Sequence, residues 1–232
     1  MSTSLKDSMA MSIAAERSSG KTIIGYNYTK NPAVTHARRL IEDGVIGRVA
    51  GFFCRYDVER ETDEQRPWSW RMSRNMSGTG GNGDVLSHVI SVANYLTGTA
   101  ISRVVGDIGA SRVIWGKKCG LTWEIQGTKG AICYDQERLN EIRLFTKSDN
   151  AATDGFKIIL TGPYHPPYEP LLPNGGHSLG YMDEKICELH ELLSLIQTDG
   201  DVWPDFTAGL KIEKVMDAVD RSTQTGNWEN VE

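Results

Sequence analysis

Apolar positions at the start of the chain predict a helix that leads straight into a strand. They recur at helical spacing over residues 4–18, and Gly20 fits the end of that helix. The apolar run at 21–26 then predicts a short buried strand. A helix followed at once by such a strand is half of a βαβ unit whose first strand is absent. We therefore expect residues 1–26 to be a remnant of a dinucleotide-binding domain.

The pattern of residues 27–232 predicts a single α+β domain. Pro32 suits the first turn of a helix and Gly44 its end. Several β-rich runs enclosed by helices are typical of a mixed, mostly antiparallel sheet. The Pro- and Gly-rich segment 161–180 predicts an ordered loop. The expected strands are 48–58, 101–108, 111–115, 121–126, 130–134 and 141–146, and the expected helices are 31–43, 84–96, 181–197 and 207–224.

Composition and charge narrow the class of protein. The 232 residues are 39% hydrophobic and 24% charged, as in ordinary globular proteins. A net charge of −5, with Lys and Arg scattered, argues against nucleic acid as the main partner. There is no apolar stretch of membrane-spanning length and no secretory signal pattern, so we expect a cytoplasmic protein with no membrane partner.

The cysteines and histidines indicate reduced thiols and no metal. No two cysteines lie closer than 14 positions, which excludes CxxC redox and zinc motifs. A zinc site from His165, His177 and His190 is conceivable, but no pair has HxxxH spacing and no carboxylate pattern accompanies them. The cysteines are Cys54, Cys119, Cys133 and Cys187.

The strongest candidate for chemistry is the pair Asp84 and His88. Residues four apart share one helical face, and a carboxylate can orient or polarise an imidazole one turn later. Such a histidine can take the proton of a substrate hydroxyl while hydride leaves the same carbon for a nicotinamide. The alternative is that Asp84 caps the helix and His88 is a packing residue.

Three further clusters have both a functional and a structural interpretation. The spacing Gly78-x-Gly80-x-x-Gly83 resembles a dinucleotide fingerprint, but polar loop precedes it, so we interpret the glycines as a tight turn that delivers Asp84 and His88 to a cleft. The cluster Trp68, Trp70 and Arg71 either stacks on a sugar ring or pins a loop to the core. The aromatic and histidine residues from Tyr164 to Tyr181, among them Tyr168 and His177, are plausible substrate contacts on the loop.

Taken in order, these motifs and several others resemble the Gfo/Idh/MocA oxidoreductases, in particular members similar to inositol 2-dehydrogenase. The resemblance covers nearly the whole chain. It rests on Gly25-Tyr26-Asn27-Tyr28, Asn31-Pro32-Ala33, Trp68-Ser69-Trp70-Arg71, Gly83-Asp84-x-x-Ser87-His88, Trp123-Glu124-Ile125-x-Gly127-x-Lys129-Gly130, Asp135-Gln136-Glu137-Arg138-Leu139-Asn140-Glu141, Gly162-Pro163-x-His165-Pro166-Pro167-Tyr168 and Pro204-Asp205-Phe206-x-x-Gly209-Leu210.

The resemblance implies a two-domain enzyme that uses NAD or NADP to oxidise a CH–OH group of a sugar or cyclitol such as inositol. Residues 27–232 would form the substrate-binding and oligomerisation domain, an open sheet with helices on one face, and copies would associate through that sheet. Asp84 and His88 would be the catalytic pair. The resemblance places Asn27 and Tyr28 near the nicotinamide, and Trp70, Arg71, His177 and Tyr181 at the substrate.

The chain also departs from the family pattern. The glycine fingerprint and the Glu-Lys-Pro motif, whose lysine is the other catalytic residue, would precede Ser2, and an internal gap is expected near Val105-Gly106-Asp107. Leu86 stands where relatives often have glycine. We therefore expect this chain to bind NAD(P) weakly and to be inactive alone. The alternatives are a non-catalytic sugar-binding or oligomerisation module and, with least support, a metal-dependent hydrolase or isomerase.

Overall fold

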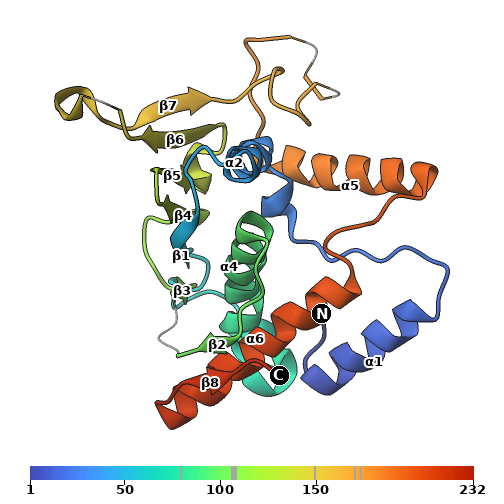
Figure 1. The fold of residues 1–232 in the computed structure, drawn as a ribbon. Helices are drawn as coiled ribbons and strands as arrows, with labels where there is room; N and C mark the ends of the chain where they lie inside the picture. The colour runs from blue at the N-terminus through green and yellow to red at the C-terminus, as the bar shows by residue number, and fades with distance from the viewer. Residues whose placement is uncertain (79, 106–108, 149, 170, 173) are drawn as a thin grey trace.

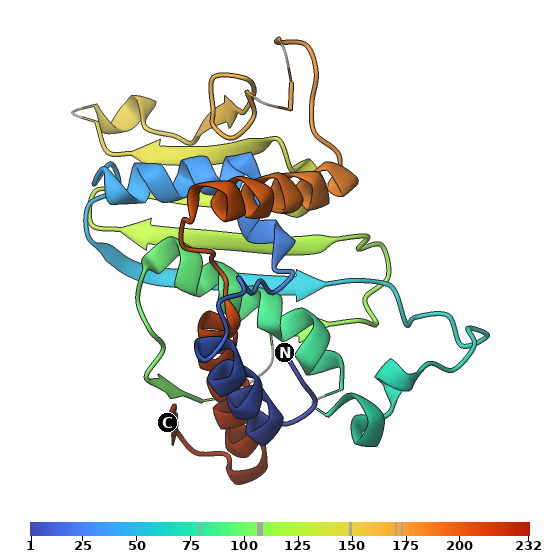
Figure 2. The same cartoon turned by 90° about the vertical axis from the view of Figure 1, so that its right-hand side faces the viewer.

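A six-stranded sheet with all its large helices on one face dominates the computed structural model (Figures 1 and 2). The structure describes residues 1–78, 80–105, 109–148, 150–169, 171–172 and 174–232, without the side chains of 81 and 82. The strand order is β3-β1-β4-β5-β6-β7, and every neighbouring pair is antiparallel except β1 and β3. The predicted mixed, mostly antiparallel open sheet is confirmed. Its strands are β1 (Val49–Asp57), β3 (Ala110–Ser111), β4 (Gly120–Gly127), β5 (Gly130–Asp135), β6 (Glu141–Thr146) and β7 (Lys157–Leu160).

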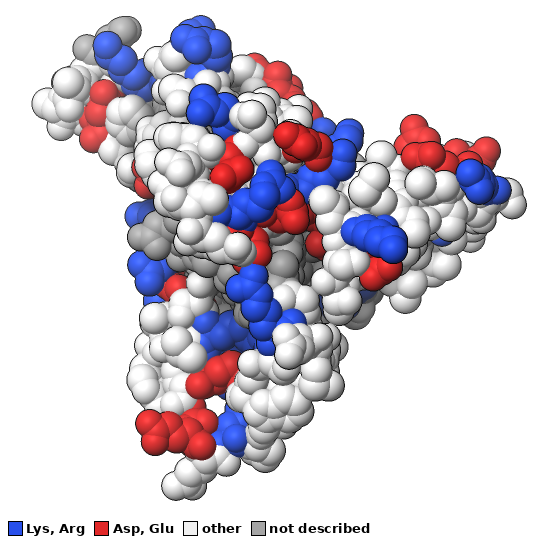
Figure 3. All heavy atoms as spheres, turned by 90° about the horizontal axis from the view of Figure 1, so that it is seen from below, with Lys and Arg blue, Asp and Glu red and all other residues white. Residues whose placement is uncertain are grey.

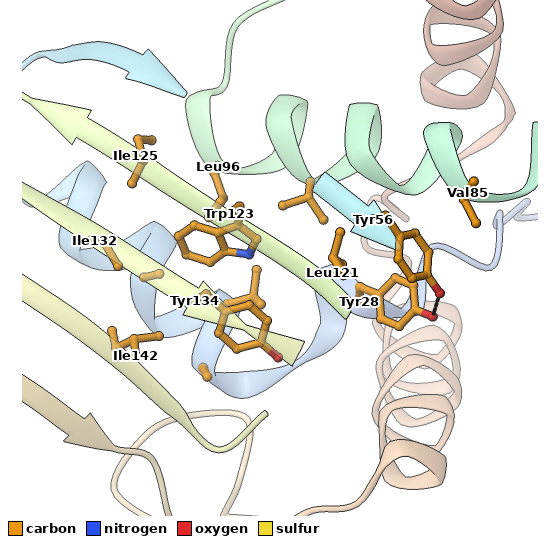
Figure 4. Close-up of a cluster of buried hydrophobic side chains, with 14 of the residues drawn as sticks. Tyr28, Tyr56, Val85, Leu96, Leu121, Trp123, Ile125, Ile132, Tyr134 and Ile142 are labelled. Atoms are coloured by element: carbon orange, nitrogen blue, oxygen red, sulfur yellow. Dashed lines mark hydrogen bonds between the residues drawn. The ribbon is translucent and has the colours of Figure 1, made fainter. Parts of the chain in front are cut away.

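Alternating side chains decide which face of the sheet is buried. On β4, Leu121, Trp123 and Ile125 point to the helices and are buried, because successive strand residues point to opposite faces. The indole ring of Trp123 stacks on the ring of Tyr134 from β5, with centroids 5.3 Å apart (Figure 4). Phe53 of β1 points to the other face and is 64% exposed. One face of the sheet therefore carries the core and the other is open.

The helices follow the predicted ranges closely because their ends carry strong capping residues. The side chain of Asn31 accepts a hydrogen bond from the Ala33 amide (2.7 Å), and Pro32 occupies the first turn of α2. Asp205 caps α6 in the same way, and α4 ends at Gly98 in the left-handed region. The helices are α1 (Leu5–Glu16), α2 (Pro32–Glu42), α3 (Arg74–Ser77), α4 (Gly81–Thr97), α5 (Tyr181–Thr198) and α6 (Phe206–Thr225).

The strand predicted at residues 21–26 is wrong. These residues run between α1 and a 3₁₀ turn, η1 (Asn27–Lys30), without pairing to any described strand. The Ile24 amide instead donates to the carbonyl of Pro204 (2.9 Å), in the connection between α5 and α6. A strand needs a neighbouring strand to share its hydrogen bonds, and this segment has none beside it. Helix α1 packs against α6 (Figure 1).

Two other strand predictions are too long. Within 101–108 only β2 (Arg103–Val104) is a strand, paired with β8 (Glu229–Asn230), while residues 106–108 lie outside the described part together with most of the expected internal gap. Of 111–115 only the first residue is in β3, and Trp115 is 71% exposed. Apolar side chains at 113 and 115 find no packing surface in this chain, so propensity alone does not make a strand. Strands β7 and β8 lie outside the predicted ranges.

The helices and the surface charges bear on membrane and nucleic-acid binding. No helix in the described ranges is long and apolar enough to cross a bilayer. Acidic and basic side chains are interspersed over the face drawn in Figure 3, and that face carries no continuous basic stripe of the kind that nucleic acids require.

Candidate active site

A cavity of about 580 Å³ opens where β1 ends and α4 begins. Its walls come from η1, β1, the first turns of α4, the start of α5 and two loops at the end of the sheet. Among the residues that line it are Tyr28, Tyr56, Asp84, His88, Arg112 and Tyr181. Four of these six are site residues predicted from the sequence.

His88 lies on the second turn of α4, packed edge-on against tyrosine rings. The ring centroids of Tyr28, Tyr26 and Tyr56 lie 4.7, 5.4 and 6.0 Å from that of His88. Its Nδ1 atom is buried and has no hydrogen-bond partner among the described residues. Burial lowers the pKa of His88 to about 4, although the charge of Asp84 acts in the opposite direction. The imidazole is therefore neutral near neutral pH and can accept a proton.

The lowered pKa of His88 predicts a loss of stability in mild acid. Between pH 6.5 and 4 the His88 imidazole binds a proton in the unfolded chain but not in the native state. The stability present above pH 6.5 is therefore lost as the pH falls. The difference corresponds to about 3 kcal/mol. Urea unfolding at pH 7 and pH 4.5 measures this loss, and His88→Gln is expected to reduce it. An NMR titration midpoint near 6.5 for the His88 ring contradicts the prediction.

Asp84 lies one turn before His88, in the first turn of α4. Because the helix begins at Gly81, Asp84 is not the capping residue, and the capping interpretation is wrong. Its carboxylate lies 3.5 Å from the Arg112 guanidinium and 3.8 Å from that of Arg71. Asp84 therefore stands at the cavity between two arginines and His88, where its charge favours an imidazolium ion.

Two phenol hydroxyls and one thiol lie together at the cavity. The hydroxyls of Tyr28 and Tyr56 are 2.5 Å apart (Figure 4), and the Cys119 thiol donates to Tyr28 at 3.4 Å. Burial raises the pKa of both phenols, which therefore stay protonated and can hydrogen-bond to hydroxyl groups of a ligand. Tyr56 and Cys119 were not predicted as site residues. For Tyr56 a signal was available in the sequence: the alternation along β1 points its side chain inward near the end of the strand.

Asn27, the second residue predicted near the nicotinamide, faces away from the cavity. It is buried, and its side-chain amide donates to Glu184 at 3.3 Å. Glu184, from α5, also accepts hydrogen bonds from Asn31 and Gln136, both at 2.8 Å. Asn27 thus belongs to a buried polar cluster that joins η1, α2 and α5 behind the site. The sequence reasoning did not identify Glu184.

The tryptophan–arginine cluster reaches the site through Arg71. Trp68 and Trp70 are 64% and 45% exposed, so they do not pin the loop to the core. The Arg71 guanidinium lies over the Trp70 ring at 4.3 Å and approaches Asp84. Neither Trp70 nor Arg71 lines the cavity, and Arg71 approaches it only through Asp84.

The loop 161–180 does not line the cavity, but α5, which follows it, does. Tyr181, directly after it, lines the cavity with its ring 6.3 Å from that of Tyr28. His177 is exposed and does not line the cavity. The loop is anchored by Tyr168, which is fully buried and donates to Asn140. Tyr181, but not His177, therefore lies at the cavity.

The glycine-rich turn does not form a dinucleotide cradle. Gly78 and Gly80 have φ of 72° and 65°, and a 3₁₀ turn, η2 (Trp70–Met72), and the short α3 precede them rather than a strand. The one parallel pairing among the described strands is that of β1 with the two-residue β3. The residues described here therefore do not fit the pyrophosphate of NAD(P). Within the same ranges, no three His, Cys, Asp or Glu side chains are placed to hold a metal ion.

Sequence comparison identifies the relatives of the chain. A family model described as the GFO/IDH/MocA C-terminal domain matches residues 34–113. Over 97% of its length the chain is 30% identical to levoglucosan dehydrogenase from Pseudarthrobacter phenanthrenivorans, and it covers 70% of that protein. The chain belongs to the Gfo/Idh/MocA family. The alignment runs over 275 residues, more than the 232 of this chain, so the relative contains positions without a counterpart here.

Solved structures of other Gfo/Idh/MocA-type proteins show the same fold. Levoglucosan dehydrogenase in complex with NADH and L-sorbose superimposes with a TM-score of 0.92 at 30% identity, over 99% of this chain and 71% of that one. An NAD binding oxidoreductase from Klebsiella pneumoniae gives a TM-score of 0.90, also at 30% identity and with the same coverage. The resemblance deduced from the motifs is thus confirmed at the level of family and fold.

Proposed function

We propose that this chain is the sugar-binding part of an NAD(P)-dependent dehydrogenase that oxidises a CH–OH group of a sugar or cyclitol such as inositol. The observation that carries the proposal is a neutral, half-buried His88 at the wall of a cavity lined by tyrosine hydroxyls. A 30%-identical relative is a levoglucosan dehydrogenase, which gives independent support for a sugar as the substrate.

The roles of the residues follow from their chemistry. His88, uncharged at neutral pH, takes the proton of the substrate hydroxyl. Asp84 stabilises the imidazolium that results, because a nearby carboxylate favours the charged form. Tyr28 and Tyr56 remain protonated and hold neighbouring hydroxyls of the ring, while Trp70, Arg71 and Tyr181 bound the substrate from the rim.

The dinucleotide is assigned to a part of the enzyme that these 232 residues do not contain. The described residues form neither a glycine-rich phosphate cradle after a strand nor a parallel βαβ unit. We take residues 1–26 as the end of the nucleotide-binding domain and 27–232 as the substrate domain. In this proposal the chain alone binds NAD(P) weakly and does not turn over.

Calorimetry on the purified 232-residue chain tests both halves of the proposal. We expect no saturable NADH binding at millimolar concentration, and saturable binding of a sugar or cyclitol that shifts the His88 NMR signals. Saturable NADH binding, or NADH formation from a sugar, contradicts the assignment of the dinucleotide to another part. A chain in which no sugar among levoglucosan, L-sorbose and myo-inositol perturbs His88 contradicts the assignment of the cavity.

A second candidate function is that of a non-catalytic sugar-binding or oligomerisation module. The open face of the sheet favours it, because Phe53, Ile158 and Leu160 are exposed there by 64%, 53% and 71%. In either case we propose that copies of the chain associate through this face. Sedimentation velocity is expected to show a dimer that Phe53→Arg disrupts, and a monomeric wild type contradicts the idea. We also propose a cytoplasmic location, which the four free thiols support.

A further inference from the structure

The candidate cavity has basic walls in a protein that is acidic as a whole. Three cationic side chains line it, those of Arg60, Arg112 and Lys118. Against these three cations stand two lining carboxylates, Glu59 and Asp84, whereas the whole chain carries a net charge of −5. A cleft with this local excess attracts anions, because its low-dielectric walls focus the field. Outside the lining, Arg71 lies 3.8 Å from Asp84, and Glu61 pairs with Arg112 and, at 3.8 Å, with Arg66.

Arg112 is the buried member of this set. Its side chain is 7% exposed, pairs with Glu61 and lies 3.5 Å from Asp84. Its Nε atom is buried without a hydrogen-bond partner among the described residues. A buried N–H of a guanidinium costs free energy until an acceptor meets it. Arg112 therefore offers an unmatched donor at the wall of the cavity.

Arg60 is the cation at the cavity without a carboxylate partner. Lys118 is paired with Glu59, and Arg112 is paired with Glu61, whereas no ion pair involves the Arg60 side chain within the described ranges. Arg60 is exposed, so it is free to turn toward a ligand. A planar guanidinium matches the two oxygens of a carboxylate in a way that a sugar hydroxyl does not.

We propose that the substrate of this site is a sugar that carries a carboxylate, of the uronate or aldonate class. The carboxylate meets Arg60 and Arg112, and the ring hydroxyls meet the phenols and His88. The inference rests on the proposed function, since it uses the same cavity and names its substrate class. A volume of about 580 Å³ accommodates a six-carbon sugar acid with its first waters.

The test compares two ligands that differ in charge but hardly in shape. Calorimetry at low ionic strength measures binding of D-glucuronate and of the neutral D-glucuronamide to the 232-residue chain. We expect glucuronate to bind at least about tenfold more tightly, as for one charge-assisted hydrogen bond, with a preference that fades in 0.3 M salt (about a 6 Å screening length). Arg60→Gln is expected to remove most of that preference by weakening the binding of glucuronate.

A paired variant and a matched control keep the test decisive. Arg112→Gln alone removes the close partner of Glu61, which then keeps only Arg66 at 3.8 Å, so the variant to use is Arg112→Gln with Glu61→Gln, checked by circular dichroism. Arg138, an exposed arginine paired with Glu141 away from the cavity, is the control, and Arg138→Gln is expected to change nothing. Equal loss in Arg138→Gln, or equal affinity for both ligands, overturns the substrate class and leaves the cavity as a sugar site. Failure of every sugar to bind overturns the proposed function as well.

Discussion

Glu184→Ala is expected to lower the free energy of unfolding by about 3–5 kcal/mol, because it strands three buried amide donors. Asn27, Asn31 and Gln136 each donate to this carboxylate, and none of the four side chains is open to water. Each donor left without a partner costs about 1–3 kcal/mol. Urea unfolding monitored by tryptophan fluorescence measures the change. The loss also separates α5 from η1 and α2, so the cavity wall at Tyr181 should loosen with it.

Two variants frame this prediction. Glu42 lies on the exposed side of α2 in an i,i+4 pair with Arg38, so Glu42→Ala should cost about 0.5 kcal/mol or less. Glu184→Gln retains an acceptor and should cost far less than Glu184→Ala. A loss below 1 kcal/mol for Glu184→Ala refutes a structural role for the buried polar cluster.

The pH dependence of Glu184 has a definite sign. Burial raises the pKa of this carboxyl in spite of its hydrogen bonds, so the native state holds the proton more tightly than the unfolded chain does. Its contribution to stability is complete below the ordinary glutamate pKa and declines as the pH rises through the raised value. Glu184→Gln has no such titration. The stability difference between wild type and Glu184→Gln should therefore shift in favour of the glutamine variant as the pH rises from about 4.

Trp123→Ala is the second large expected effect, a destabilisation of about 3–5 kcal/mol. The indole is 2% exposed at the centre of the core and stacks on Tyr134 (Figure 4). Its removal leaves a cavity between the sheet and the helices that the rigid strands β4 and β5 cannot close. Thermal and urea unfolding measure the change.

The indole nitrogen gives this second prediction an internal check. Trp123 Nε1 is buried and has no hydrogen-bond partner among the described residues. Trp123→Phe deletes that unmatched donor together with some volume, so its cost should fall well below that of Trp123→Ala. Phe53→Ala, on the exposed face of the neighbouring strand β1, should cost less than 1 kcal/mol. Equal losses for Phe53→Ala and Trp123→Ala contradict the burial of one sheet face.

The elements with strong local signals were predictable from sequence. Asn31-Pro32 begins α2, Gly98 ends α4, and the alternation at 121–126 and 130–134 identifies β4 and β5, because caps and side-chain periodicity act within a few residues. Short strands escaped prediction or were overextended. β3, β8 and the segment 21–26 depend on whether a partner lies beside them, which no local pattern states.

The candidate site divides in the same way. The i,i+4 spacing of Asp84 and His88 placed both on one face of a helix, and the structure puts both at one cavity. The capping role weighed for Asp84 failed because the helix begins three residues earlier than the pattern suggested. The structure leaves the predicted roles of Asn27 and His177 as predictions, since Asn27 joins a buried cluster and His177 lies exposed outside the cavity.

By itself the sequence determined the family, the α+β class, the main helices and the helical register that joins Asp84 to His88, because these depend on motifs and on periodicity within one element. Only the tertiary structure decided which residues surround them. Tyr56, Arg112, Cys119 and Glu184 come from segments far apart in the chain and meet through long-range packing, which also sets the burial that lowers the pKa of His88. Burial and nearby charge depend on which residues meet in space, and a single sequence does not show which residues meet.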